Sequence, residues 1–239
     1  MVKIGVSGAL GRMGKRIIHC ARLHKEASVV FGLEYKGHPD LGNTVEGVPV
    51  TDDPEKITAC QSLIEFTSPK ATLDHLSFAV KYKKAMVIGT TGFSQQEREM
   101  IFKAGEIIPV VFSPNMSVGV NLVFRLLEEA AKVLQDYKVE MEEAHHIHKK
   151  DAPSGTAKKM AEIINQQGFN LKYEDIRSLR EGEIVGDHKV VFESDVDTVT
   201  ISHSAKNRDI FAQGAVRAAV WAADKKPGLY SMADILFKS

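Results

Sequence analysis

The sequence predicts an α/β protein that combines a doubly wound parallel sheet with a second, smaller α/β domain containing a mixed sheet. Short apolar runs alternate with amphipathic stretches through the first half of the chain, which indicates strands joined by helices. A glycine-rich turn follows the first apolar run. In the second half the strand-like runs are longer and alternate between apolar and polar residues, which is typical of a mixed or antiparallel sheet with a solvated face.

Five runs in the first half are predicted to be strands of the parallel sheet. They are rich in β-branched residues, nearly continuous in apolar character and bounded by turn residues, as strands buried on both faces should be. Strands joined by helical crossovers are expected to be parallel and connected right-handedly. The five runs are VKIGVS (2–7), SVVFGLE (28–34), SLIEFT (62–67), AMVIGT (85–90) and IIPVVF (107–112).

Helices are predicted over 14–25, 69–84 and 94–106 between these runs, and two of them carry start signals. Pro69 stands at a first-turn position, where its missing N–H costs nothing. Ser94 and Glu97 have the spacing of a capping box. In the second half, helices are predicted over 118–134 and from about Ser154, strands within 176–194 and 197–207, and helical structure again over 209–236.

Composition excludes some classes of function. The 31 Lys and Arg residues balance the 31 Asp and Glu residues, so nothing in the net charge favours nucleic acid or a membrane surface. Cys20 and Cys60 have no metal-type spacing, and we expect two buried thiols in a reducing compartment. We find neither a signal-peptide pattern nor an apolar run long enough to span a membrane, and we expect a cytoplasmic protein.

The glycine-rich turn GALGRMG predicts a dinucleotide site. Gly8, Gly11 and Gly14 lie between a strand and a helix, where backbone amides and the helix dipole favour a pyrophosphate. The usual pattern is G-x-G-x-x-G, and Ala9 takes the place of its first glycine. Many such turns bind nothing, but Glu34 ends the second strand 20 positions after Gly14, where an acidic residue binds ribose hydroxyls.

Glu34 also bears on the choice of cofactor. Its carboxylate would repel a 2′-phosphate, which favours NADH over NADPH. Lys36 offers a phosphate one cation, so the use of NADPH stays open.

Small and hydroxyl-bearing residues follow the other predicted parallel strands. Ligands bind at this edge of an open α/β sheet. Each stretch taken alone fits an ordinary turn as well as it fits a ligand site. Because all of them are expected at one edge of the sheet, together they favour a cofactor site. The stretches are FTSP (66–69), GTTGF (89–93) and SPNMSVG (113–119).

The stretch EAHHIHKKDAPSGTA (143–157) concentrates protonatable groups. His145 and Lys149 lie one turn apart on a helix, and they share a face on a strand. Either geometry places an imidazole near an ammonium, which suits a general acid tunable around neutral pH. The alternative is a solvated polar strand followed by a helix cap.

The end of the same stretch predicts an anion cradle. Amides around Ser154, Gly155 and Thr156 would be unsatisfied first-turn donors of a helix, suited to a carboxylate or phosphate. A metal is not expected, because we identify no carboxylate or cysteine to complete a ligand set and two lysines would repel a cation.

The chain resembles the 4-hydroxy-tetrahydrodipicolinate reductase (dihydrodipicolinate reductase) family of the diaminopimelate–lysine pathway. The His–Lys–Asp-Ala-Pro-Ser-Gly-Thr stretch is that family's signature, and the matching pieces cover nearly the whole length. They are GALGRMG, LEYK, EFTSP, GTTGF, SPNMSVGVN, EAHHIHKKDAPSGTA, GAVRAAVW and GLYSMADIL.

The resemblance implies a Rossmann-like dinucleotide domain over 1–116 that is completed by C-terminal helices (212–239). It implies a substrate-binding and oligomerisation domain over 117–211, usually assembled as a homotetramer. A dicarboxylate would be reduced by NAD(P)H. Many relatives carry arginine after the acidic residue, whereas this chain has Tyr35, which again disfavours NADPH.

The resemblance also assigns roles to individual residues. His145 would be the proton donor or acceptor, and Lys149 would be a second proton donor that holds a substrate carboxylate. His146, Gly155 and Thr156, with Ser154, would bind the dicarboxylate. The cofactor would be lined by Gly8, Ala9, Leu10, Gly11, Arg12, Met13, Glu34, Gly89, Thr90, Thr91, Ser113, Pro114, Asn115 and Met116.

Two other functions are open from the residues alone. One is a dinucleotide-binding regulator without catalysis, in which the His/Lys cluster senses an anion. The other is a related dehydrogenase that acts on another small anionic substrate.

Overall fold

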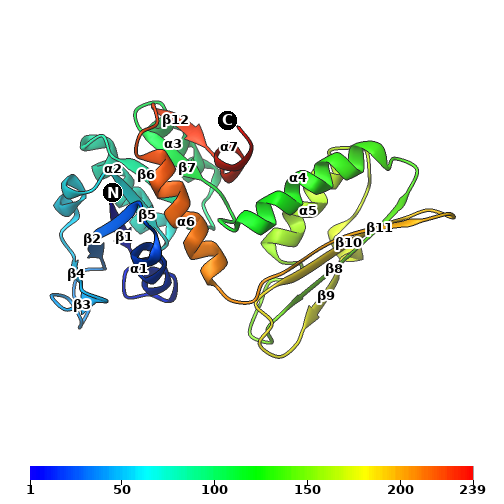
Figure 1. The fold of residues 1–239 in the computed structure, drawn as a ribbon, viewed down its shortest axis with the longest axis horizontal. Helices are drawn as coiled ribbons and strands as arrows, with labels where there is room; N and C mark the ends of the chain where they lie inside the picture. The colour runs from blue at the N-terminus through cyan, green and yellow to red at the C-terminus, as the bar shows by residue number, and fades with distance from the viewer. Residues whose placement is uncertain (239) are drawn as a thin grey trace. The chain divides into compact units, whose positions relative to one another are not determined.

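The computed structural model describes residues 1–238, and the chain forms two compact units. The first unit combines Met1–Ser117 with the chain from Asp209 onward, and the second is Val118–Arg208. Figure 1 traces the chain through both units. The predicted α/β class is confirmed, with a mostly parallel sheet in one unit and a mixed sheet in the other.

The sheet of the first unit has the strand order β12-β7-β6-β5-β1-β2-β4-β3. The pairings from β12 to β4 are parallel. Among the described strands of this sheet, only the β3–β4 pair is antiparallel. The strands are β1 (Val2–Ser7), β2 (Ala27–Leu33), β3 (Thr44–Val45), β4 (Val48–Thr51), β5 (Ser62–Glu65), β6 (Ala85–Ile88), β7 (Pro109–Phe112) and β12 (Gly228–Tyr230).

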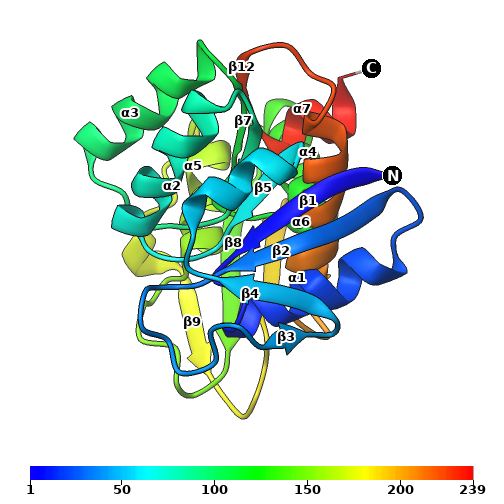
Figure 2. The ribbon, with the colours of Figure 1, turned by 90° about the vertical axis from the view of Figure 1, so that its left-hand side faces the viewer.

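Helices cover both faces of this sheet, as Figure 2 shows. Helices α1 and α6 pack together, while α2 and α3 pack together on the opposite face. The predicted start signals are confirmed, since Ser68 caps α2 ahead of Pro69, and Ser94 with Glu97 forms a capping box at α3. The helices are α1 (Arg12–Leu23), the 3₁₀ helix η1 (Pro54–Ala59), α2 (Pro69–Lys81), α3 (Gln95–Gly105), α6 (Asp209–Ala222) and α7 (Met232–Phe237).

Two parts of the first unit differ from the sequence-based prediction. Residues 35–50, for which the sequence indicated no role, contain β3 and the start of β4, which extend the sheet beyond β2. The prediction that 209–236 is helical was wrong at Gly228–Tyr230, which pairs in parallel with β7. Three residues are too few to show a period of two, and the open edge of β7 decides their conformation.

The second unit is a four-stranded sheet of order β11-β10-β8-β9 with two helices on one face. The β8–β9 pair is parallel and the others are antiparallel, which confirms the predicted mixed sheet. Leu127, Met160 and Phe192 lie fully buried where α4 and α5 meet the sheet. The elements are α4 (Val118–Val133), β8 (Lys138–His145), α5 (Gly155–Asn165), the 3₁₀ helix η2 (Tyr173–Asp175), β9 (Arg177–Arg180), β10 (Asp187–Glu193) and β11 (Thr198–Ser204).

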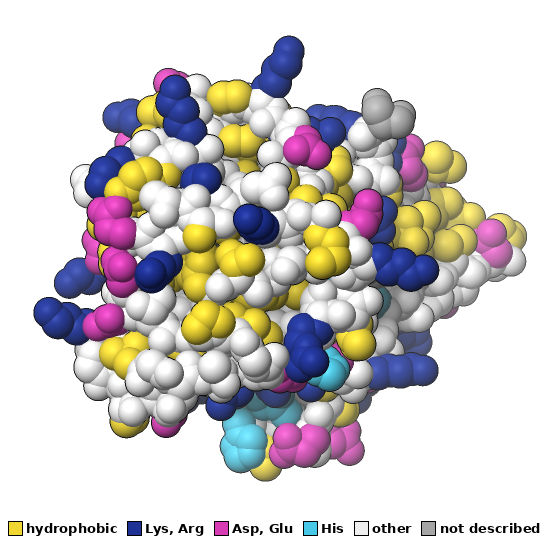
Figure 3. Space-filling model, turned by 60° about the vertical axis from the view of Figure 1, so that its left-hand side comes forward, with side chains coloured by type: hydrophobic (Ala, Val, Ile, Leu, Met, Phe, Trp, Pro, Cys, Tyr) yellow, Lys and Arg dark blue, Asp and Glu magenta, His cyan; other side chains and the backbone are white. Residues whose placement is uncertain are grey.

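The surface carries mixed charge, and both thiols are buried. On the face drawn in Figure 3, Lys and Arg side chains are interspersed with Asp and Glu side chains. Cys20 and Cys60 are free and buried, as expected. Over the described part of the chain, no helix has the length and apolar character required to cross a bilayer.

Candidate active site

The first unit gathers the predicted cofactor residues at one edge of its sheet. The chain continues from β1 to β2 on one side, whereas β5 pairs with β1 on the other, so the strand order reverses at β1. Ligands of open α/β sheets bind outside the carboxyl ends of the strands at this kind of reversal. Gly8–Met13, Glu34, Gly89–Thr91 and Ser113–Met116 follow the carboxyl ends of β1, β2, β6 and β7.

The glycine-rich turn has the backbone that an anion cradle requires. Gly8 has a φ of +70°, and a Cβ there would lie 2.7 Å from the carbonyl oxygen of Phe66, so both conformation and space require glycine. The amides of Gly8 and Ala9 donate to the carbonyl of Leu33. Gly11 caps α1 without a side-chain hydrogen bond, so the first-turn amides of α1 have no capping side chain to satisfy them.

Glu34 is tied to this turn. Its Oε2 accepts a hydrogen bond from the Leu10 amide at 3.1 Å, and its Oε1 accepts one from the Tyr35 amide at 3.1 Å. Each carboxylate oxygen has further lone pairs for a ribose hydroxyl. A pocket of about 470 Å³ beside it is lined by Ser7, Gly8, Glu34, Tyr35, Lys36, Asp52, Pro54, Thr67, Ser68, Ala71, Asp74, His75 and Phe78.

The other predicted cofactor residues lie outside the lining of this pocket. Thr90 is buried and its Oγ1 accepts hydrogen bonds from the amide of Thr67 and the hydroxyl of Thr72, each at 3.0 Å. Ser113 donates from its hydroxyl to the carbonyl of Asn115 at 2.9 Å. Thr90 and Ser113 therefore hold the turns after β6 and β7 in shape.

The second unit carries the histidine-rich stretch. His145 is the last residue of β8 and is 8% exposed. Lys149 is neither on a helix nor on a strand, so both predicted geometries were wrong for it. The strand ends at His145, and the amide of Lys149 closes a turn onto the carbonyl of His146. The Lys149 ammonium lies 2.7 Å from Asp151.

The predicted anion cradle starts α5. Ser154 is its N-cap, and its hydroxyl oxygen accepts a hydrogen bond from the Ala157 amide at 3.1 Å, which confirms the predicted helix start. A Cβ built on Gly155 would meet nothing within 4 Å. The prediction of unsatisfied donors was wrong for two of these amides, because the Ser154 amide donates to Oε1 of Glu143 at 3.3 Å and the Gly155 backbone hydrogen-bonds the Asp151 carboxylate. The first turn of α5 thus already receives carboxylates of this chain, which is the chemistry that a helix start favours.

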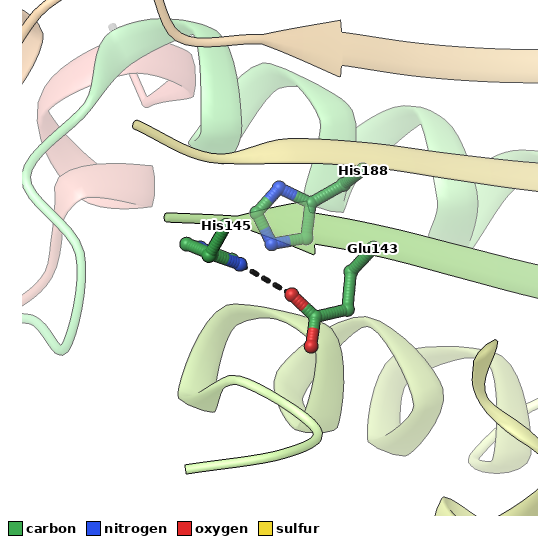
Figure 4. Close-up of side chains that lie close together, drawn as sticks. All are labelled: Glu143, His145 and His188. Carbon is green, nitrogen blue, oxygen red and sulfur yellow. Dashed lines mark hydrogen bonds and ion pairs between the residues drawn. The ribbon is translucent and has the colours of Figure 1, made fainter. Parts of the chain in front are cut away.

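Three residues that the sequence-based prediction did not include surround His145. The Nδ1–H of His145 donates to Oε2 of Glu143 in a short hydrogen bond, and the His188 ring lies edge-on to His145 with centroids 5.3 Å apart (Figure 4). Arg180 donates to Oε1 of Glu143 at 2.8 Å. Strand alternation places residue 143 on the face of residue 145, so Glu143 was recognisable from the sequence.

The protonation states in this cluster follow from burial and charge. Burial opposes ionisation of Glu143, but hydrogen bonds from His145 and Arg180 outweigh it and lower the pKa of the carboxyl to about 2. Burial, helped by the charge of His145, lowers the pKa of His188 to about 4. At neutral pH the cluster therefore contains a carboxylate, a guanidinium and a neutral His188.

The sequence-based argument against a metal was wrong in one premise. A carboxylate does lie beside the histidines, because ligand-type atoms of Glu143, His145 and His188 lie within 4.8 Å of one another. Arg180 and the Ser154 amide share Oε1 of that carboxylate, and His145 uses Oε2. A guanidinium on the same carboxylate disfavours a cation.

The first unit has a parallel sheet with a glycine-rich turn and an acidic residue after its second strand. The second unit has a mixed sheet and a His/Lys cluster. Together these features define the class of two-domain dinucleotide-dependent oxidoreductases. Residues 2–116 match the family model of the dihydrodipicolinate reductase N-terminus, and residues 119–236 match that of its C-terminus. The chain belongs to the dihydrodipicolinate reductase family.

Individual relatives agree with this assignment. The chain is 43% identical to the 4-hydroxy-tetrahydrodipicolinate reductase of Geotalea uraniireducens, with 99% of each chain covered. It is 44% identical to that of Aquifex aeolicus, with 98% of each covered. Among solved structures, the dipicolinate-bound dihydrodipicolinate reductase from Paenisporosarcina sp. TG-14 has the same fold, with a TM-score of 0.83 at 23% identity over 98% of each chain.

Proposed function

We propose that this chain reduces 4-hydroxy-tetrahydrodipicolinate to tetrahydrodipicolinate with NADH or NADPH, in the diaminopimelate–lysine pathway. Membership of the reductase family over both halves of the chain is the observation that carries this proposal. A regulator without catalysis is not favoured, because the curated relatives are named reductases along their full length.

We assign the two units separate tasks. The start of α1, which no side chain caps, and Glu34 in the neighbouring pocket fit a dinucleotide, so the first unit would hold the cofactor. When bound, the reduced nicotinamide supplies a hydride. The second unit would bind the substrate and form the contacts between subunits.

The residues of the second unit suit the proton and anion chemistry. After water has left the ring, the hydride would add to one carbon of the acceptor and His145 would donate a proton to the adjacent carbon. Solvent would then return a proton to His145. Lys149 would hold one substrate carboxylate and act as a second proton donor. The start of α5 at Ser154, Gly155 and Thr156, with His146, would bind the dicarboxylate and orient the ring.

NADH is the proposed preferred cofactor. The Glu34 carboxylate lines the pocket in which a 2′-phosphate would have to lie. Tyr35, which is 63% exposed, brings no positive charge, and Lys36 is the only Lys or Arg residue in the described lining. Repulsion from Glu34 should outweigh attraction to one flexible ammonium on the open surface.

We further propose a cytoplasmic homotetramer. The two free, buried thiols fit a reducing compartment. In the second unit the sheet face opposite α4 and α5 is uncovered and mixes both signs of charge, since Lys138, Glu140, Lys189 and Glu193 are exposed there and Arg177 pairs with Glu142 at 3.0 Å. Light scattering coupled to gel filtration checks the assembly, and a monomer at micromolar concentration would contradict it.

Cofactor oxidation in a coupled assay tests the central proposal. The substrate is made in place from pyruvate and aspartate semialdehyde by the preceding synthase, and the loss of NADH or NADPH absorbance is followed. Oxidation that depends on the synthase is the expected result. NADH binding without synthase-dependent oxidation, by protein shown to be folded, would overturn the reductase and favour the regulator or another substrate.

A further inference from the structure

Glu143 is an ionised carboxylate in the interior of the second unit. Its side chain is 0% exposed. An isolated buried carboxylate is strongly disfavoured, so its partners determine whether it is tolerated. Each of its oxygens is occupied, and each contact leads to a different part of the candidate site.

The first contact sets the orientation of His145. Glu143 and His145 are two residues apart on β8 and share its inner face. Because an ionised carboxylate only accepts hydrogen bonds, Nδ1 of the imidazole must carry the proton between them. The other ring nitrogen, Nε2, is then the one available to a substrate.

The space beside Nε2 is kept open by Gly186. A Cβ built on Gly186 would lie 3.0 Å from Nε2 of His145 and 3.7 Å from the His188 ring. A side chain at this position would therefore crowd Nε2, the ring nitrogen that is not bonded to Glu143. The glycine and the carboxylate act on opposite sides of one imidazole.

The second and third contacts anchor the carboxylate. Oε1 accepts from Arg180 on β9 at 2.8 Å and from the Ser154 amide, at the start of α5, at 3.3 Å. Arg180 also donates to the carbonyl of Asp151, just ahead of that helix. Glu143 thus links the imidazole to the start of α5.

The remaining groups around the imidazole do not replace this role. His188, on β10, is directly opposite Glu143 in the strand register, and its Nε2 lies 3.2 Å from the Ser154 hydroxyl. His146 is the neighbouring titratable group along the chain, and Lys149 is paired with Asp151. Glu143 is therefore the one described carboxylate that bonds directly to His145.

We propose that Glu143 is a positioning residue for the reduction: it holds His145 with Nε2 toward the substrate. The inference depends on His145 being the proton donor, as proposed above. Arg180 acts through Glu143 by keeping the carboxylate in place.

Glu143→Gln tests the proposal because the amide keeps the shape and loses the charge. We expect kcat to fall roughly 100-fold, the lower part of the range for general acids. The affinity for NADH should not change.

The matched control is Glu162→Gln, an exposed carboxylate on α5 that pairs with Lys159 at 3.2 Å. It should keep the wild-type kcat. His145→Asn tests the role of His145 by itself, and that role fails if the variant turns over normally. If His145→Asn is inactive but Glu143→Gln has the wild-type kcat, only the role of Glu143 fails.

A measurement on the unmutated protein covers the case in which Glu143→Gln does not fold. Nitrogen NMR of ¹⁵N-histidine-labelled protein reports which ring nitrogen is protonated, and His145→Asn assigns the resonances. We expect a proton on Nδ1 of His145 across the neutral range. A neutral ring with the proton on Nε2 and a bare Nδ1 would overturn the proposal.

Discussion

His75 donates a hydrogen bond from Nδ1 to Oε2 of Glu65 at 2.9 Å, in the first unit. The Glu65 side chain is 0% exposed and that of His75 is 19% exposed. Ser7 lies 3.1 Å from the same ring nitrogen, and Thr67 donates a short hydrogen bond to Oε1 of Glu65. This pair joins the carboxyl ends of β1 and β5 beneath the candidate cofactor pocket, which His75 helps to line.

The His75–Glu65 pair makes stability depend on pH. Burial alone would lower the pKa of His75, but the hydrogen bond and charge of Glu65 raise it above the ordinary value of 6.5. The stabilisation is therefore complete below pH 6.5 and is lost as pH rises through the raised value. We expect the gap in melting temperature between the wild type and His75→Asn to shrink between mildly acidic and alkaline pH. A gap that widens with pH would contradict this reading.

Glu34→Gln should change cofactor selectivity. The amide oxygen can still accept from the Leu10 amide, but the negative charge that repels a 2′-phosphate is gone. We expect the kcat/KM ratio of NADH to NADPH to fall by roughly 10- to 100-fold, as for the loss of a hydrogen bond to a charged group. Steady-state rates with both cofactors measure it, and an unchanged ratio would show that Glu34 does not select the cofactor.

His145→Asn should act on the chemical step. A general acid contributes about 10²–10⁴-fold, so we expect kcat to fall within that range while the KM for substrate changes little. The affinity for NADH, followed by fluorescence, should stay at the wild-type value because the dinucleotide site is assigned to the other unit. Turnover within twofold of wild type would exclude His145 as the proton donor.

Lys149→Met should show a different pattern. Its ammonium is one of the charges available to a substrate carboxylate, although Asp151 holds it at 2.7 Å in the free protein. Losing a charged hydrogen bond costs about 1.5–3 kcal/mol, so we expect the substrate KM to rise by roughly 10- to 100-fold, with kcat also reduced. Inhibition constants of a small aromatic dicarboxylate give a second readout. Unchanged values of both would remove Lys149 from the site.

Gly186→Ala tests the space beside His145. The new methyl group would lie 3.0 Å from Nε2, so the ring or the strand must shift by a few tenths of an ångström. Small displacements of a reacting group are costly, and we expect kcat to fall by about 10- to 100-fold. Circular dichroism and NADH affinity serve as controls for folding. Wild-type kcat in a folded variant would show that the substrate approaches from another side.

The sequence by itself determined most of the local structure and one motif. Period-two and continuous apolar runs, with Pro69, Ser94 and Ser154 at helix starts, predicted many of the strands and helices near their observed limits, but not β3, β4 or β12. The turn GALGRMG followed by Glu34 predicted the candidate dinucleotide pocket, which Gly8 and Glu34 line, because both lie within one β-α-β stretch. Such features are read from neighbouring residues, and so they survive without knowledge of the rest of the fold.

Only the tertiary structure decided which distant residues meet. Glu143, Arg180 and His188 converge because β8 pairs in parallel with β9 and antiparallel with β10, and this register brings residues 37 and 45 positions away against one carboxylate. The same holds for Gly228–Tyr230, which becomes a strand because the edge of β7 is open to it. Backbone pairing between remote segments leaves no periodic signal in either segment, and a shift of one residue would turn each side chain to the other face.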